Sequence, residues 1–158
     1  MNRRRFLQVG AAGTALLVTV GWFARPRSGV VEALVPVVLD GSLPAAGPER
    51  AKAIADVAEA FRRAVTGLSP AVQAEVAQLM ALLQFAPTRF AFTGIATPLG
   101  QAQAADIAAF LARWRASRFD LLRASYQALT QLIQAAWYDN PASWAAIGYP
   151  GPPRKALA

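Results

Sequence analysis

The sequence ERAKAIADVAEAFRRAVT, residues 49–66, is a clear helical pattern in a chain of 158 residues. Its apolar residues recur at offsets of three, four and seven, which places them on one face of an α-helix. They are Ile54, Val57, Ala58, Phe61 and Val65. The charged residues lie mostly off that face, and Gly67 follows as a residue that commonly ends helices. We therefore expect a helix over Glu49–Thr66 that buries one side.

A second helix is expected after Gly67. Ser69 can serve as the N-cap and Pro70 as the first helical residue. Its apolar stripe comprises Val72, Val76, Leu79, Met80 and Leu83. The proline and glycine in 85–94 then predict an irregular stretch, which Pro98, Leu99 and Gly100 end.

Two more helices follow in the second half of the chain. One is expected over about Gln101–Ala116 and the other over about Phe119–Trp137. The inward residues of the first are Ile107, Phe110, Leu111 and Trp114, and those of the second are Leu122, Tyr126, Leu129 and Ile133. No segment alternates with period two for long enough to form a sheet.

The pattern predicts an all-α protein, a small helical bundle of about four helices with short loops over residues 34–136. An N-terminal signal or anchor segment (1–33) precedes it, and an irregular segment rich in aromatic residues, proline and glycine (137–158) follows it. Val30–Leu39 is expected to form a short helix that is broken or started near Pro36, before a loop over 40–48.

The chain has no cysteine and no histidine. Their absence excludes a covalent c-type haem site, an iron–sulfur cluster, a Cys/His zinc site and a Ser-His or Cys-His nucleophile. No glycine-rich nucleotide loop is visible, and the nine carboxylates are too dispersed to suggest a catalytic pair. We therefore expect no catalytic residue, metal or cofactor in this chain.

The net charge of +7 is concentrated at the N-terminus. Residues 1–33 hold five arginines and one glutamate, whereas the remainder holds 11 basic and 8 acidic residues. Such a weakly basic body is not the electrostatic footprint of a nucleic-acid-binding protein. Four arginines, at 113, 115, 118 and 123, surround the join of the last two helices, where they form either a solvated face or a contact to an acidic partner.

The N-terminal sequence MNRRRFLQ resembles the twin-arginine export signal, which directs folded proteins across the inner membrane. The residues that carry the resemblance are Arg3, Arg4, Phe6 and Leu7. A mildly apolar run over Val9–Ala24 follows. The resemblance implies the twin-arginine translocase as a partner and the periplasmic side of the inner membrane as the destination.

Two fates of this leader remain open. Val31-Glu32-Ala33 offers small or aliphatic residues at the two positions that a signal peptidase reads, so cleavage after Ala33 is one. The other is retention as an anchor, because Val9–Ala24 extended by Phe6 and Leu7 reaches the roughly 17–25 residues that span a bilayer.

The C-terminal segment is unusual for a helical bundle, because two tryptophans and two tyrosines lie among prolines and glycines. Pro141 disfavours continuation of the helix beyond Asn140. Stiff aromatic segments lose little entropy on docking and offer a large contact area. The segment either folds back over its own bundle or binds a partner. The candidate partner-binding residues are Trp137, Tyr138, Trp144, Tyr149, Pro150, Gly151 and Pro152.

This C-terminal pattern, WYDNP followed by WAAIGYPGP, resembles that of the small subunit of membrane-bound flavin dehydrogenases, the gluconate 2-dehydrogenase subunit 3 type. The segments ALVPVVLDG (33–41) and RFAFTG (89–94) and the leader are also similar to that family. Some relatives carry cysteines, which this chain lacks.

The resemblance implies an accessory role beside a large flavoprotein of the glucose–methanol–choline class, which would hold FAD, and often beside a multihaem cytochrome c. The large subunit commonly lacks a leader, so the small subunit would escort it across the membrane. The alternative is a stand-alone, membrane-anchored helical scaffold of the envelope.

Overall fold

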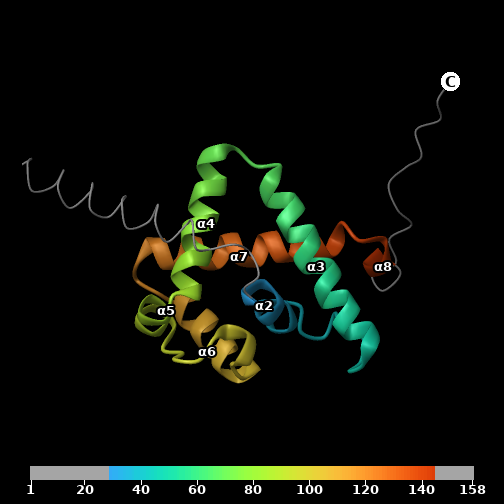
Figure 1. Ribbon diagram of the computed structural model, residues 1–158, viewed down its shortest axis with the longest axis horizontal. Coiled ribbons are helices and arrows are strands. Elements are labelled where there is room, and N and C mark those ends of the chain that lie inside the picture. Colours follow the sequence, from blue (N-terminus) through green and yellow to red (C-terminus); the bar gives the residue numbers. More distant parts are fainter. Residues whose placement is uncertain (1–28, 145–158) are drawn as a thin grey trace, which may run out of the picture.

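The computed structural model describes residues 29–144, and within this range it is all-α, without a strand. Seen along the chain, α2 (Val30–Val38) is followed by α3 (Pro48–Thr66) and α4 (Pro70–Gln84), which form an antiparallel pair (Figure 1). The chain continues through α5 (Ala86–Thr93) and a short 3-10 turn, η1 (Leu99–Gln101). It ends with α6 (Ala104–Arg115), α7 (Asp120–Tyr138) and the single turn α8 (Pro141–Trp144).

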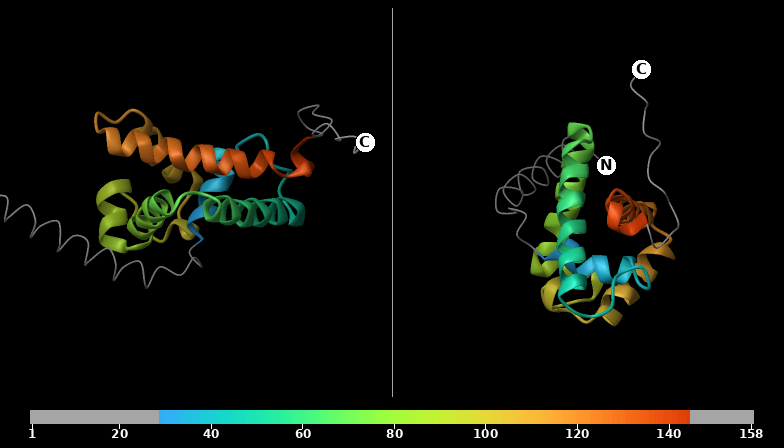
Figure 2. Two further views of the ribbon diagram at one scale, coloured as in Figure 1. Left: turned by 90° about the horizontal axis from the view of Figure 1, so that it is seen from above. Right: turned by 90° about the vertical axis from the view of Figure 1, so that its right-hand side faces the viewer.

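The short helix α2 is the centre of the bundle. It contacts α3, α6, α7, α4 and η1, and α3 and α7 also pack directly against each other beside it (Figure 2). Leu34 and Val35 of α2 are completely buried. They join the fully buried side chains of Leu83, Ile107, Phe110, Leu129 and Ile133 in one hydrophobic core. Pro36 lies inside α2 and does not break it.

The expected apolar faces are largely confirmed. Val57, Ala58 and Phe61 of α3 are buried, as are all four residues predicted to face inward on α6. Phe110 and Trp114 meet edge to face with ring centroids 5.4 Å apart. The α3–α4 turn is fixed by Gln73, whose side-chain amide donates to the Thr66 and Leu68 carbonyl oxygens, while the Ser69 side chain makes no capping bond.

The prediction of an irregular stretch over 85–94 is wrong, because this region forms α5. Pro87 lies in the first turn of α5, where a backbone N–H has no helical partner to lose. Gly94 ends α5 in the left-handed conformation, with φ of 74° and its N–H donated to the Phe90 carbonyl oxygen. The expected bundle of about four helices is therefore extended by α5 and α8.

The structure also differs from two other expectations, the burial of Val72 and the first residue of α6. Val72 was predicted to face inward but is exposed on the first turn of α4. The helix expected over Gln101–Ala116 begins only at Ala104, because Leu99–Gln101 forms the separate turn η1. No helix between residues 29 and 144 combines the length and apolar character needed to cross a bilayer.

Candidate functional site

Several charged side chains of the described region form ion pairs at the surface. Lys52 pairs with Asp56 at 2.7 Å, and Arg62 pairs with Glu32 at 2.8 Å. Within residues 29–144 no group of three or more His, Cys, Asp or Glu side chains could hold a metal ion.

A largely apolar groove of about 440 Å³ separates α4 from the first half of α7. We call it the α4–α7 groove. It is lined by Val72, Glu75, Val76, Gln78, Leu79, Leu82 and Leu83 of α4, Phe92 of α5, Trp114 of α6, and Leu121, Leu122, Ala124, Ser125 and Ala128 of α7. Helices α4 and α7 border this groove without packing closely against each other.

Several apolar side chains in the walls of this groove are exposed to solvent. Leu121 is 72% exposed, Phe92 is 43% exposed and Val72 is 39% exposed. Leu121 lies in the first turn of α7, directly after the helix-starting Asp120, so no neighbouring turn covers it. Contiguous exposed apolar surface on a small soluble domain commonly marks an interaction site.

More exposed aromatic side chains lie on the elements that border the groove. Phe85 and Phe90 belong to the start and the outer face of α5, and Phe119 immediately precedes α7. The guanidinium of Arg118 lies over the Phe119 ring, 4.9 Å from its centroid. This end of the bundle therefore presents aromatic and aliphatic side chains to solvent on several elements.

Sequence reasoning missed the α4–α7 groove. The helical period of α4 places Val72 on the same stripe as Val76 and Leu83, so periodicity alone predicted that it is buried. One signal was available in the sequence. Leu121 and Leu122 are adjacent on a helix, so both cannot lie in the centre of the same buried stripe.

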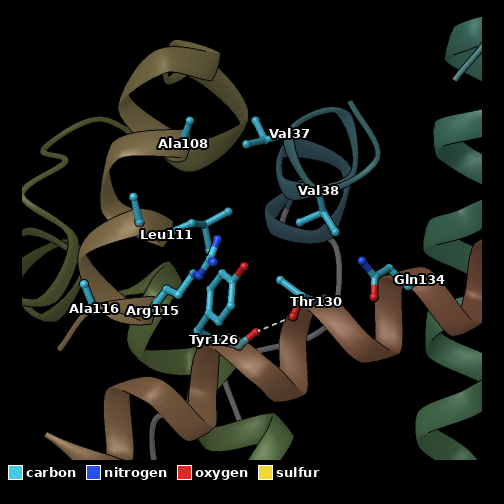
Figure 3. Close-up of a pocket in the computed structure, with 10 residues that line it drawn as sticks. Val37, Val38, Ala108, Leu111, Arg115, Ala116, Tyr126, Thr130 and Gln134 are labelled. Atoms are coloured by element: carbon cyan, nitrogen blue, oxygen red, sulfur yellow. Dashed lines mark hydrogen bonds between the residues drawn. The ribbon is translucent and has the colours of Figure 1, made fainter. Parts of the chain in front are cut away.

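A second pocket, of about 530 Å³, lies between α2, α6 and α7 (Figure 3). Its apolar wall includes Val37, Val38 and Leu111, while Arg115 and Tyr126 point into it. The Thr130 hydroxyl donates to the Tyr126 carbonyl oxygen at 2.8 Å and so faces its own helix. The pocket offers a cation and a phenol for binding but no nucleophile with a neighbouring base.

The residues predicted from the C-terminal pattern take different positions. Trp137 is only 6% exposed and packs in the core, whereas its neighbour Tyr138 is half exposed. Trp144 lies in α8 and its indole N–H donates to the Tyr138 carbonyl oxygen at 2.8 Å. Trp137 thus stabilises the bundle, and Tyr138 and Trp144 meet at the end of α7.

The remaining predicted site residues lie outside the described region. These are Arg3, Arg4, Phe6 and Leu7 of the export signal, and Tyr149, Pro150, Gly151 and Pro152 of the C-terminal segment.

The four arginines around the α6–α7 join are not one uniform cationic surface. Arg113 donates to the Thr93 carbonyl oxygen, and Arg123 donates to the Ser117 carbonyl oxygen and pairs with Asp120. Arg115 lines the second pocket, and Arg118 stacks on Phe119. These contacts within the chain favour a structural role for Arg113 and Arg123.

The chain matches no protein-family model, and comparison with curated proteins and with solved structures gives no match either.

Proposed function

We propose that this protein is a non-catalytic small subunit that escorts a large flavin-dependent sugar or alcohol dehydrogenase into the periplasm and stabilises it there. FAD would belong to the large subunit, and a multihaem cytochrome c would be a further member of the complex. The complex would be associated with the inner membrane.

The observation that carries this proposal is the α4–α7 groove. Its apolar walls, with Leu121, Phe92 and Val72 exposed, suit the burial of apolar side chains from another protein. Glu75 and Ser125 add polar groups to the lining, which can accept or donate hydrogen bonds to a partner. An accessory subunit needs such a docking surface and needs no reactive centre.

Two features of the sequence support the same role. The leader resembles a signal for folded cargo, and the absence of cysteine and histidine leaves the chain few means of holding a redox cofactor. An export signal of this kind on a chain without a visible cofactor site is explained if the folded cargo is a second protein.

The test is co-purification of the two subunits with variants of Leu121. The chain is co-expressed with a large glucose–methanol–choline-type flavoprotein that has no leader of its own, and the flavin absorbance that co-purifies with the tagged chain is measured. Leu121→Asp should reduce recovery about 30-fold, since loss of one buried anchor costs about 2 kcal/mol. Aspartate in the first turn of α7 is compatible with the helix dipole, so the variant should remain folded.

Two controls make the result specific. Leu121→Met keeps the side chain apolar and should retain binding, and Gln127→Asp changes an exposed α7 residue that does not line the groove. If Leu121→Asp recovers as much flavoprotein as the wild-type chain does, the α4–α7 groove is not the surface that binds the flavoprotein. If neither the wild-type chain nor any variant recovers flavoprotein, while the chain still reaches the membrane, the result would favour the stand-alone envelope scaffold.

A further inference from the structure

The first turn of α2 coincides with the candidate signal-peptidase site at Val31-Glu32-Ala33. The helix begins at Val30, ahead of this motif, and runs through it to Val38. Val31, which would occupy one of the two positions that the peptidase reads, is 7% exposed, and Val30 is 4% exposed. The motif is therefore helical and partly buried in the folded protein.

Several contacts hold this segment in place. The Ala33 N–H donates to the Gly29 carbonyl oxygen at 2.9 Å, so the hydrogen-bonded turn encloses the whole motif. Glu32 pairs with Arg62 of α3 at 2.8 Å. Directly after the motif, Leu34 is completely buried at the centre of the bundle, where α2 meets α3, α6 and α7 (Figure 2).

Cleavage after Ala33 is incompatible with this arrangement. Proteolysis of a helical core segment requires prior local opening, and core elements open rarely. Cleavage would also remove Val30 and Val31 from the core and Glu32 from its ion pair. A peptidase that meets the chain after it has folded would find no extended substrate there.

We infer that the leader is not removed after Ala33 and remains attached to α2 as an anchor in the lipid bilayer. This inference rests on the proposed export of the chain as a folded protein. The apolar run of residues 9–24, extended by Phe6 and Leu7, has the length of a short membrane span. Arg3, Arg4 and Arg5 precede it and favour a cytoplasmic N-terminus, which leaves the bundle on the periplasmic side.

The direct test exposes the purified full-length chain, in detergent, to purified signal peptidase and follows the intact mass. The matched control is the double variant Pro26→Ala with Ser28→Ala, which gives the peptidase two small residues ahead of α2. The control should be cut after residue 28. The native wild-type chain should be cut after Ala33 at least about 100-fold more slowly, because cleavage follows the small population of the opened helix. A product that begins at Leu34 and forms as fast as the control product would overturn the inference.

A second arm examines the exported chain in cells. Protease added from the periplasmic side identifies the wild-type chain that has been exported. This exported chain should stay with the membrane after an alkaline wash. It should also still carry the residues ahead of Val30. A soluble periplasmic chain with Leu34 as its first residue would overturn the inference. A chain that never becomes accessible would contradict the proposed export, whereas the peptidase result in detergent would still stand.

Discussion

Arg89 is a buried arginine that fixes the connection between α4 and α6. Its Nη1 donates to the Gln84 carbonyl oxygen at 2.8 Å, at the end of α4. Its Nη2 donates to the Ala96 carbonyl oxygen at 2.7 Å, and its Nε donates to that of Ile95 at 3.3 Å. One side chain thus satisfies backbone groups on both sides of α5 and holds that helix against the bundle.

We predict that Arg89→Met lowers the free energy of unfolding by about 2–4 kcal/mol. The methionine would fill the space but leave buried or half-buried carbonyl oxygens without a donor. Urea denaturation followed by circular dichroism measures the change. The matched control is Arg118→Met, an exposed arginine that stacks on Phe119, for which we expect less than about 1 kcal/mol. Equal effects of the two substitutions would show that the carbonyl contacts of Arg89 do not stabilise the fold.

Helix α7 turns its last two residues to different environments. Trp137 packs in the core, and Tyr138 faces solvent. Pro141 then starts α8, whose Ser143 hydroxyl donates to the Asn140 carbonyl oxygen at 2.8 Å. The chain thereby changes direction beside the Asp56, Glu59 and Arg63 side of α3, where a small pocket of about 250 Å³ lies. Trp144, the last described residue, therefore lies at the end of α7 opposite its first turn.

At the scale of this element, we predict that Tyr138→Ala combined with Tyr149→Ala weakens the flavoprotein complex without unfolding the chain. Aromatic anchors at interfaces cost about 2–4 kcal/mol on truncation, which corresponds to roughly 30- to 1000-fold in affinity. Trp137→Ala should instead lower the free energy of unfolding by about 3–5 kcal/mol, because its side chain is in the core. Pull-down measures the first effect and thermal unfolding by circular dichroism measures the second. Full recovery of the flavoprotein by the folded double variant would mean that the C-terminal segment only covers its own bundle.

The elements show where sequence patterns suffice and where they fail. Helices α3 and α7 were predictable because their apolar faces persist over several turns. Helix α5 was not, since Pro87 reads as a helix breaker unless its place in the first turn is known. Val72 was misplaced because periodicity gives the face of a helix but not how far a neighbouring helix extends along it.

For the whole molecule, the central role of α2 was not predictable from the sequence. The apolar pattern of this nine-residue segment predicts a helix but not its neighbours, yet α2 contacts most of the other helices. The α4–α7 groove was not predicted from the sequence either. The C-terminal pattern pointed to aromatic anchors, whereas the α4–α7 groove depends on the relative placement of two helices, which no local pattern encodes.

We propose that this chain carries a large flavoprotein across the inner membrane. The most direct measurement is the amount of that flavoprotein in the periplasmic fraction when it is co-expressed with Arg3→Lys, Arg4→Lys chain in place of wild type. A matched control, Arg5→Lys, changes the neighbouring arginine and leaves the Arg3-Arg4 pair and its spacing to Phe6-Leu7 intact. We predict that the double variant abolishes export of both proteins and that the control exports them at the wild-type level. Flavoprotein that reaches the periplasm unchanged while the double variant stays in the cytoplasm would contradict the escort role.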